Sequence, residues 1–152
     1  MKVVGMQAVV ASALLLFANT LLAGEDALPW AFKARPAEGY AIDLVSVHPA
    51  PGTPLVAGTS VEFKITVKYS MTIAKTGSIA LIFQDEKDRS AKSEDAEFVQ
   101  MAVSEPEGTM TLTDTVAIPK RAKELRLFVP LFPEGLRETS GEVTIRYPIE
   151  KK

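Results

Sequence analysis

Apolar and polar residues alternate along most of the chain, and residues 60–71, SVEFKITVKYSM, show this most clearly. One parity is apolar and holds Val61, Phe63, Ile65, Val67, Tyr69 and Met71. Because the side chains of a strand point alternately to its two faces, this pattern predicts a half-buried β-strand. We expect its apolar face to pack into a core and its polar face to contact water.

Seven runs of this kind follow one another along the chain. They cover residues 42–47, 61–71, 78–85, 97–103, 109–118, 124–132 and 142–149. Clusters of Pro, Gly, Asp and Ser separate them, and no long segment has the period of a helix. Short alternating runs between turn residues predict an all-β protein, namely a seven-stranded antiparallel sandwich that forms one domain over residues 42–150.

Two residues interrupt the pattern, and each gives an expectation about its own strand. Asp114 falls on the same parity as the apolar Leu112 and Val116, so a β-bulge is expected beside it. Pro148 lies in the last run. Because proline has no N–H to donate to a neighbouring strand, the last strand is expected at the edge of a sheet.

The first residues of the chain differ from the rest. Lys2 is followed by an apolar stretch that runs from Val3 to about Ala23, before the first acidic residues. This arrangement predicts a secretory signal peptide over residues 1–23 with cleavage after Ala23. An uncleaved membrane anchor is the alternative, since about 20 apolar residues are long enough to span a bilayer. Residues 24–41 have no steady period and are expected to form an extended N-terminal arm.

Composition narrows the classes of function. The chain has 152 residues, a net charge of −2 and no cysteine. Nucleic-acid binding usually needs a basic face, which this charge balance does not favour. A protein without cysteine has no disulfides, thiol chemistry or covalent haem, and together with the short leader this favours a bacterial periplasmic or secreted protein. Membrane contact is expected only from the leader.

Three segments resemble immunoglobulin-like and fibronectin-type-III-like β-sandwich domains of exported bacterial proteins. PLVAGTSVEFKITVKY at residues 54–69 leads into a long second strand, and LRLFVPL and VTIRYPI look like a closing strand pair. The chain lacks the two core cysteines and the third-strand tryptophan of antibody domains. The resemblance therefore implies sandwich architecture alone, because one fold serves many functions.

Residues that support catalysis are few. His48 is the one histidine of the chain, and no cysteine is present to complete a zinc or copper site with it. The acidic stretch at residues 85–97 is interleaved with Lys and Arg and lacks the spacing of a calcium loop. No nucleophile elbow or phosphate-binding glycine loop occurs. We therefore expect no catalytic residue, no metal and no cofactor.

The runs 78–85 and 124–132 are apolar on both parities. In an immunoglobulin-like topology the third and sixth strands are neighbours, so Ile82 and Phe128, with Phe132 on the same parity, are expected to form an apolar patch on the outer face of one sheet. Such a patch needs a cover. The arm is one candidate, through Trp30 and Phe32. A partner protein or a second copy of the chain is another, and a different strand pairing remains open.

These observations favour an exported, non-catalytic module for protein–protein interaction or a structural role, in the periplasm or outside the cell. Recognition is expected through the patch or by strand addition at a sheet edge. A carbohydrate- or surface-binding module is an alternative, since four threonines share one parity of residues 109–115. A metal-dependent enzyme, with His48 close to the acidic stretch, is a second alternative.

Overall fold

The computed structural model describes residues 32–35, 38–94, 99–135 and 141–152. Within these ranges the chain forms nine β-strands and no helix. The strands are β1 (Phe32–Arg35), β2 (Tyr40–His48), β3 (Leu55–Val56), β4 (Ser60–Met71), β5 (Gly77–Asp85), β6 (Val99–Val103), β7 (Glu107–Ala117), β8 (Glu124–Pro133) and β9 (Gly141–Glu150). None of the described segments is a helix of the length and apolarity needed to cross a membrane.

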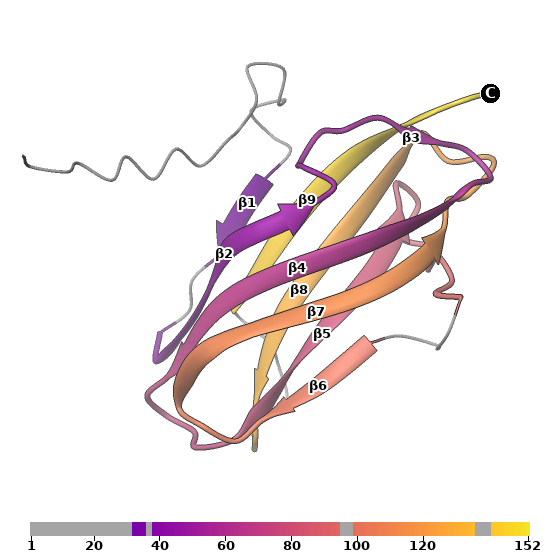
Figure 1. Ribbon diagram of the computed structural model, residues 1–152. Helices are drawn as coiled ribbons and strands as arrows, with labels where there is room; N and C mark the ends of the chain where they lie inside the picture. Colours follow the sequence, from indigo (N-terminus) through magenta and orange to yellow (C-terminus); the bar gives the residue numbers. More distant parts are fainter. Residues whose placement is uncertain (1–31, 36–37, 95–98, 136–140) are drawn as a thin grey trace, which may run out of the picture.

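Two sheets face each other (Figure 1). The large sheet has the order β1-β9-β8-β5-β6, and the short strand β3 pairs in parallel with the end of β9. The small sheet has the order β2-β4-β7. The all-β, two-sheet prediction is confirmed, and each of the seven predicted runs matches a strand. The number of strands was wrong, because β1 and β3 also pair with β9 although they are too short to show a clear alternation.

Aromatic contacts join the two sheets at the centre of the core. The ring of Phe63 in β4 lies 4.9 Å from that of Phe83 in β5 and 5.3 Å from that of Tyr147 in β9, measured between centroids. Tyr147 is fully buried, and its hydroxyl donates a hydrogen bond of 2.9 Å to the carbonyl oxygen of Pro49. The apolar parity of residues 60–71 thus packs inward, as its alternation predicts.

The expectations for Asp114 and Pro148 were wrong. Strands β4 and β7 pair without a register shift, so there is no bulge at Asp114 and its carboxyl group is buried. The bulge lies instead in β2, between Leu44 and Ser46. Strand β9 is interior to the large sheet. Pro148 is tolerated there because the next residue, Ile149, donates its N–H to the carbonyl of Lys123 just before β8, and the described pairings with β1 and β3 do not include Pro148.

Candidate functional site

Ile82 and Phe128 form a directly opposed pair between β5 and β8. The predicted pairing of the third and sixth runs is therefore present. Leu81 and Leu127, the neighbours of these residues in sequence, are 1% and 0% exposed and face the core. Because side chains alternate along a strand, Ile82 and Phe128 lie on the outer face of the large sheet, where both are partly exposed.

Phe132 continues this apolar surface along β8. It pairs with Ser78 and is also partly exposed. Between it and the Ile82–Phe128 pair lie Ala80 and Pro130, which have the outward parity and yet are buried, Ala80 to 1% exposure. We call the set Ile82, Phe128, Phe132, Ala80 and Pro130 the apolar face.

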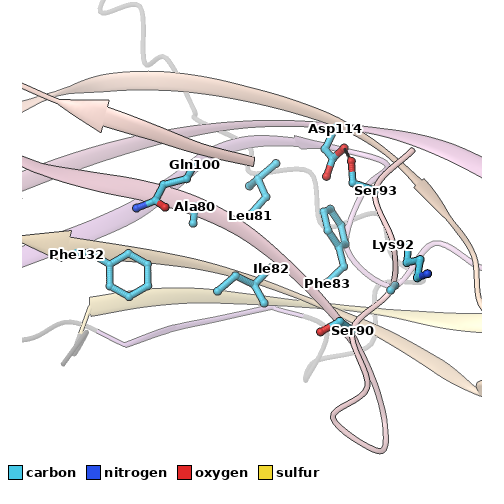
Figure 2. A pocket seen from close by; sticks show the side chains of 11 residues that line it. Ala80, Leu81, Ile82, Phe83, Ser90, Lys92, Ser93, Gln100, Asp114 and Phe132 are labelled. Atoms are coloured by element: carbon cyan, nitrogen blue, oxygen red, sulfur yellow. Dashed lines mark hydrogen bonds between the residues drawn. The ribbon is translucent and has the colours of Figure 1, made fainter. Parts of the chain in front are cut away.

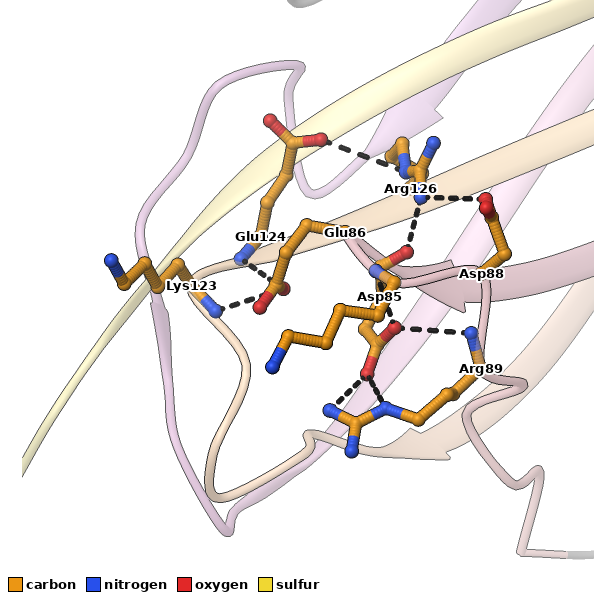
Figure 3. Close-up of polar contacts among 8 residues, drawn as sticks. Asp85, Glu86, Asp88, Arg89, Lys123, Glu124 and Arg126 are labelled. Carbon is orange, nitrogen blue, oxygen red and sulfur yellow. Dashed lines mark hydrogen bonds and ion pairs between the residues drawn. The ribbon is translucent and has the colours of Figure 1, made fainter.

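A charged cluster borders the apolar face at Arg126 (Figure 3). The guanidinium carbon of Arg126 lies 5.9 Å from the centre of the Phe128 ring, within range of a cation–π contact. The same guanidinium donates to the backbone carbonyl of Asp85 and, at 2.9 Å, to the carboxylate of Asp88. Glu124 forms a longer ion pair with Arg126 at 3.7 Å. These contacts hold Arg126 beside the aromatic ring.

The carboxylate of Asp85 organises the turn that follows β5. It accepts hydrogen bonds from the backbone N–H groups of Lys87 (2.8 Å) and Arg89 (3.0 Å) and from the Arg89 side chain (2.6 Å). Burial acts to raise the pKa of Asp85, but the hydrogen bonds from Arg89 and Lys87 and the positive charge of Arg89 outweigh it and hold that pKa below its ordinary value. This arrangement is structural.

Glu86 plays a similar part in the same cluster. Its carboxylate accepts hydrogen bonds from the backbone N–H groups of Lys123 (3.1 Å) and Glu124 (3.4 Å). Hydrogen bonds from its own N–H and from that of Lys123 lower the pKa of Glu86. The carboxylates of Asp85 and Glu86 thus bond to separate partners, and the described residues hold no group of three or more potential metal ligands.

A pocket of about 840 Å³ lies where β6 begins beside β5 (Figure 2). Its walls comprise Ala80, Leu81, Ile82, Phe83, Ser90, Ala91, Lys92, Ser93, Gln100, Asp114 and Phe132. The pairing of β5 with β6 stops at Leu81, and the next described bond on that edge runs from the Ala91 N–H to the Phe83 carbonyl at 2.9 Å. The pocket therefore has walls from both faces of β5, including three residues of the apolar face.

Asp114 brings a buried carboxyl group to the inner wall of this pocket. Its side chain is only 5% exposed, and Ser93 donates a hydrogen bond of 2.5 Å to its Oδ1 atom. The other oxygen, Oδ2, is buried and has no hydrogen-bond partner in the described structure. The sequence pattern placed Asp114 on the inward parity. Because a bulge was expected there, the sequence did not predict a buried carboxyl group at this position.

The other predicted site residues lie away from this region or outside the described residues. Phe32 belongs to β1, whose backbone pairs with Ile145 of β9, so β9 and β8 separate it from β5. Trp30 lies outside the described residues, and a contact between it and the apolar face stays a prediction. His48 ends β2 and is exposed. Among the threonines, Thr66 and Thr111 share a hydrogen bond of 2.9 Å on the small sheet.

Comparisons with known proteins give distant structural likenesses. No family model matches the chain, and no curated protein matches it. A protein assigned as a β-galactosidase from Bacteroides fragilis is similar over 71% of this chain and 15% of its own length, with 12% identity and a TM-score of 0.45. This chain thus spans less than one fifth of that protein.

Two similar structures are single domains. A CARDB domain from Pyrococcus furiosus, solved with di-metal ions, matches over 78% of this chain and 96% of its own length, with 10% identity and a TM-score of 0.44. The apo form of the Calx CBD1 domain matches over 76% and 99%, with 14% identity and a TM-score of 0.39. Likenesses of this size carry no inference about ligand or activity.

Proposed function

We propose that the chain is an exported, non-catalytic β-sandwich module that binds a partner protein through the apolar face. The observation that carries this proposal is the opposed pair Ile82 and Phe128, which presents two large apolar side chains on the outside of a sheet. Large aromatic residues and arginine are the residue types most enriched at the centres of protein interfaces. Phe128 and Phe132 with the adjacent Arg126 match that composition.

The arrangement around the apolar face also supports a partner protein. An apolar centre with a polar border is the usual anatomy of an interface, and the Arg126 cluster supplies such a border at one end. The described part of the arm extends the opposite edge of the sheet as β1. A non-catalytic role is supported by the carboxylates of Asp85 and Glu86, which are engaged by backbone amides and arginine.

A charge placed in the apolar face tests this proposal. The mature domain with Phe128→Asp is compared with Thr113→Asp, a matched control on the exposed outer face of the small sheet. Photo-crosslinking amino acids at positions 128 and 113 are then used in extract of the source compartment. We expect a defined crosslinked protein from position 128 only, and its loss in competition with unlabelled wild-type domain but not with the Phe128→Asp domain. Equal crosslinking from both positions would refute the proposal. Sedimentation of the purified domain measures its oligomeric state, and a dimer would identify a second copy of the chain as the partner.

Binding of a regular polar surface is a second candidate, and one observation favours it. Thr109, Thr111 and Thr113 are exposed on the outer face of β7, and the Thr111 hydroxyl is fixed by its bond to Thr66. Such a row of hydroxyl groups suits a polysaccharide. A glycan array and a cellulose pull-down, each with wild type and a triple alanine variant, test this candidate. Binding that survives the triple substitution would count against it.

A further inference from the structure

The pocket has lining residues from both faces of β5, with Ile82 on the outer face of the large sheet and Leu81 and Phe83 toward the interior. Strand β6 pairs with β5 as far as Leu81, and Ala91 bonds to Phe83, so no described residue pairs with Ile82 on that edge. The outer wall of the pocket is apolar at Ile82 and Phe132, and Gln100 lies beside them (Figure 2). The apolar side chains of Ile82 and Phe132 thus line the same pocket as Asp114.

The inner wall of the same pocket holds one acidic group. Asp114 has Ser93 on its Oδ1 atom, while its Oδ2 atom is buried without a hydrogen-bond partner in the described structure. Lys92, another lining residue, is exposed. A buried carboxylate oxygen without a donor is costly, and protein structures usually pair such an atom. A cation supplied by a ligand would meet this need.

The donor set restricts the kind of cation. A divalent metal needs several oxygen ligands, and Asp114 is the one carboxylate among the described lining residues. A guanidinium group prefers two free carboxylate oxygens, and here Ser93 takes one of them. An ammonium group is a compact charge with three N–H donors, and one carboxylate oxygen is enough to pair with that charge. The site therefore favours ammonium over both.

We propose that this pocket binds an organic ammonium group carried on an apolar chain, with the Asp114 carboxylate as its ionic partner and Ile82 and Phe132 in contact with the chain. The inference deepens the proposed function and rests on it for the source of the ligand, because Ile82 and Phe132 belong to both surfaces. A lysine side chain of the partner protein has this chemistry, and so does a free alkylamine.

Calorimetric titration with n-hexylammonium tests the pocket directly. The comparison ligands are 1-hexanol and hexanoate, which keep the chain and remove the positive charge, and hexylguanidinium, which changes its shape. The variants are Asp114→Asn, which keeps the size of the side chain, and the matched control Asp43→Asn, an exposed aspartate on β2. We expect hexylammonium to bind at least about tenfold more tightly than the other ligands, Asp114→Asn to lose that preference, and Asp43→Asn to keep it.

The proposal is overturned if hexylammonium does not bind to the folded wild type, if hexanol binds equally well, or if Asp114→Asn binds hexylammonium as wild type does. Circular dichroism checks that each variant is folded. If Asp114→Asn is unfolded, Ile82→Trp takes its place, because a larger side chain at the pocket wall is expected to block binding of the alkyl chain. Unchanged hexylammonium binding by a folded Ile82→Trp domain also overturns the proposal.

The source of the ammonium group is tested with a short blocked peptide that contains one lysine, against the same peptide with norleucine. Tighter binding of the lysine peptide than of hexylammonium assigns the site to a protein partner, and the reverse order assigns it to a free amine. Phe128 does not line the pocket. If the Phe128→Asp domain competes with crosslinking as well as wild type does, the proposed function fails. If the Phe128→Asp domain does not bind hexylammonium as wild type does, the pocket proposal fails instead.

Discussion

Asp114 of β7 lies directly opposite Phe63 of β4, so a carboxyl group projects into the same layer as the central aromatic ring of the core. Phe63 is 0% exposed and Asp114 only 5%. On this strand the residues on either side of Asp114 with the same parity, Leu112 and Val116, are fully buried as well. The acidic side chain thus occupies a position that the fold alone would give to an apolar residue.

Replacing this carboxylate should make the domain more stable. We expect Asp114→Asn to raise the free energy of unfolding by about 1–2 kcal/mol at neutral pH, because a neutral amide costs less to bury and still accepts the Ser93 bond. Urea unfolding followed by circular dichroism measures this. Ser93→Ala should act in the opposite direction by about 1–2 kcal/mol, since it removes the donor to Oδ1. A loss of stability in Asp114→Asn would mean that the charge is satisfied in the free protein.

The free energy of unfolding should fall at alkaline pH because of Tyr147. Burial raises the pKa of its phenol well above the ordinary 10.0, so the folded state keeps the proton that the unfolded chain releases. Stability from this group is therefore complete below about pH 10 and falls as the pH rises further, by about 1.4 kcal/mol per pH unit for one proton. Urea midpoints between neutral and alkaline pH measure the slope.

The matching variant is Tyr147→Phe. It removes the hydrogen bond to the Pro49 carbonyl and should cost about 1 kcal/mol at neutral pH. Above pH 10 it should lose less stability per pH unit than wild type, because the titrating group is gone. Parallel alkaline slopes in the two proteins would show that Tyr147 does not titrate as its burial implies.

The sequence predicted the parts of the fold that depend on side-chain period. Alternation identified the long strands, and two apolar parities in residues 78–85 and 124–132 predicted that Ile82 and Phe128 share an outer face. Strands β1 and β3 were missed because they have four and two residues, too few to show a period. They form through pairing with β9, a long-range contact that no local pattern records.

The candidate site was harder to predict. The apolar face follows from parity, but the pocket depends on where β6 begins and where residues 90–93 meet β5, and no local sequence pattern records either position. Asp114 was visible as an acid on an apolar parity. A bulge and a buried carboxylate explain that pattern equally well, and only the unshifted β4–β7 register decides between them. The expectation for Pro148 was wrong for a similar reason. The Ile149 N–H points toward β8, so the nitrogen of Pro148 points away from β8 and no bond between these strands is lost.

The free energy of unfolding should also fall at acid pH because of Asp85, whereas Tyr147 lowers it at alkaline pH. Its folded-state pKa is lowered, so its contribution to stability is present above the unfolded value near 3.8 and is lost as the pH falls through the lower folded value. We expect Asp85→Asn to destabilise the domain by about 1–3 kcal/mol at neutral pH, because charged hydrogen bonds to the turn are lost. The variant should also show a flatter stability profile below pH 4 than wild type. Thermal unfolding from acid to neutral pH distinguishes these outcomes, and a profile parallel to wild type would contradict them.

Gly77 fixes the approach of β5 to β8 at the end of the apolar face. A Cβ atom at this position would lie 2.5 Å from the backbone carbonyl oxygen of Phe132, a contact that a side-chain rotation cannot relieve. We expect Gly77→Ala to destabilise the domain by about 1–3 kcal/mol, because the two strands must separate locally. Gly141→Ala is the control, since its Cβ would meet the Tyr40 ring at a milder 3.3 Å, and it should cost clearly less. Because the displaced backbone carries Phe132, Gly77→Ala should also weaken crosslinking of the partner from position 128. A Gly77→Ala domain as stable as the Gly141→Ala control would show that β5 and β8 are spaced more widely here.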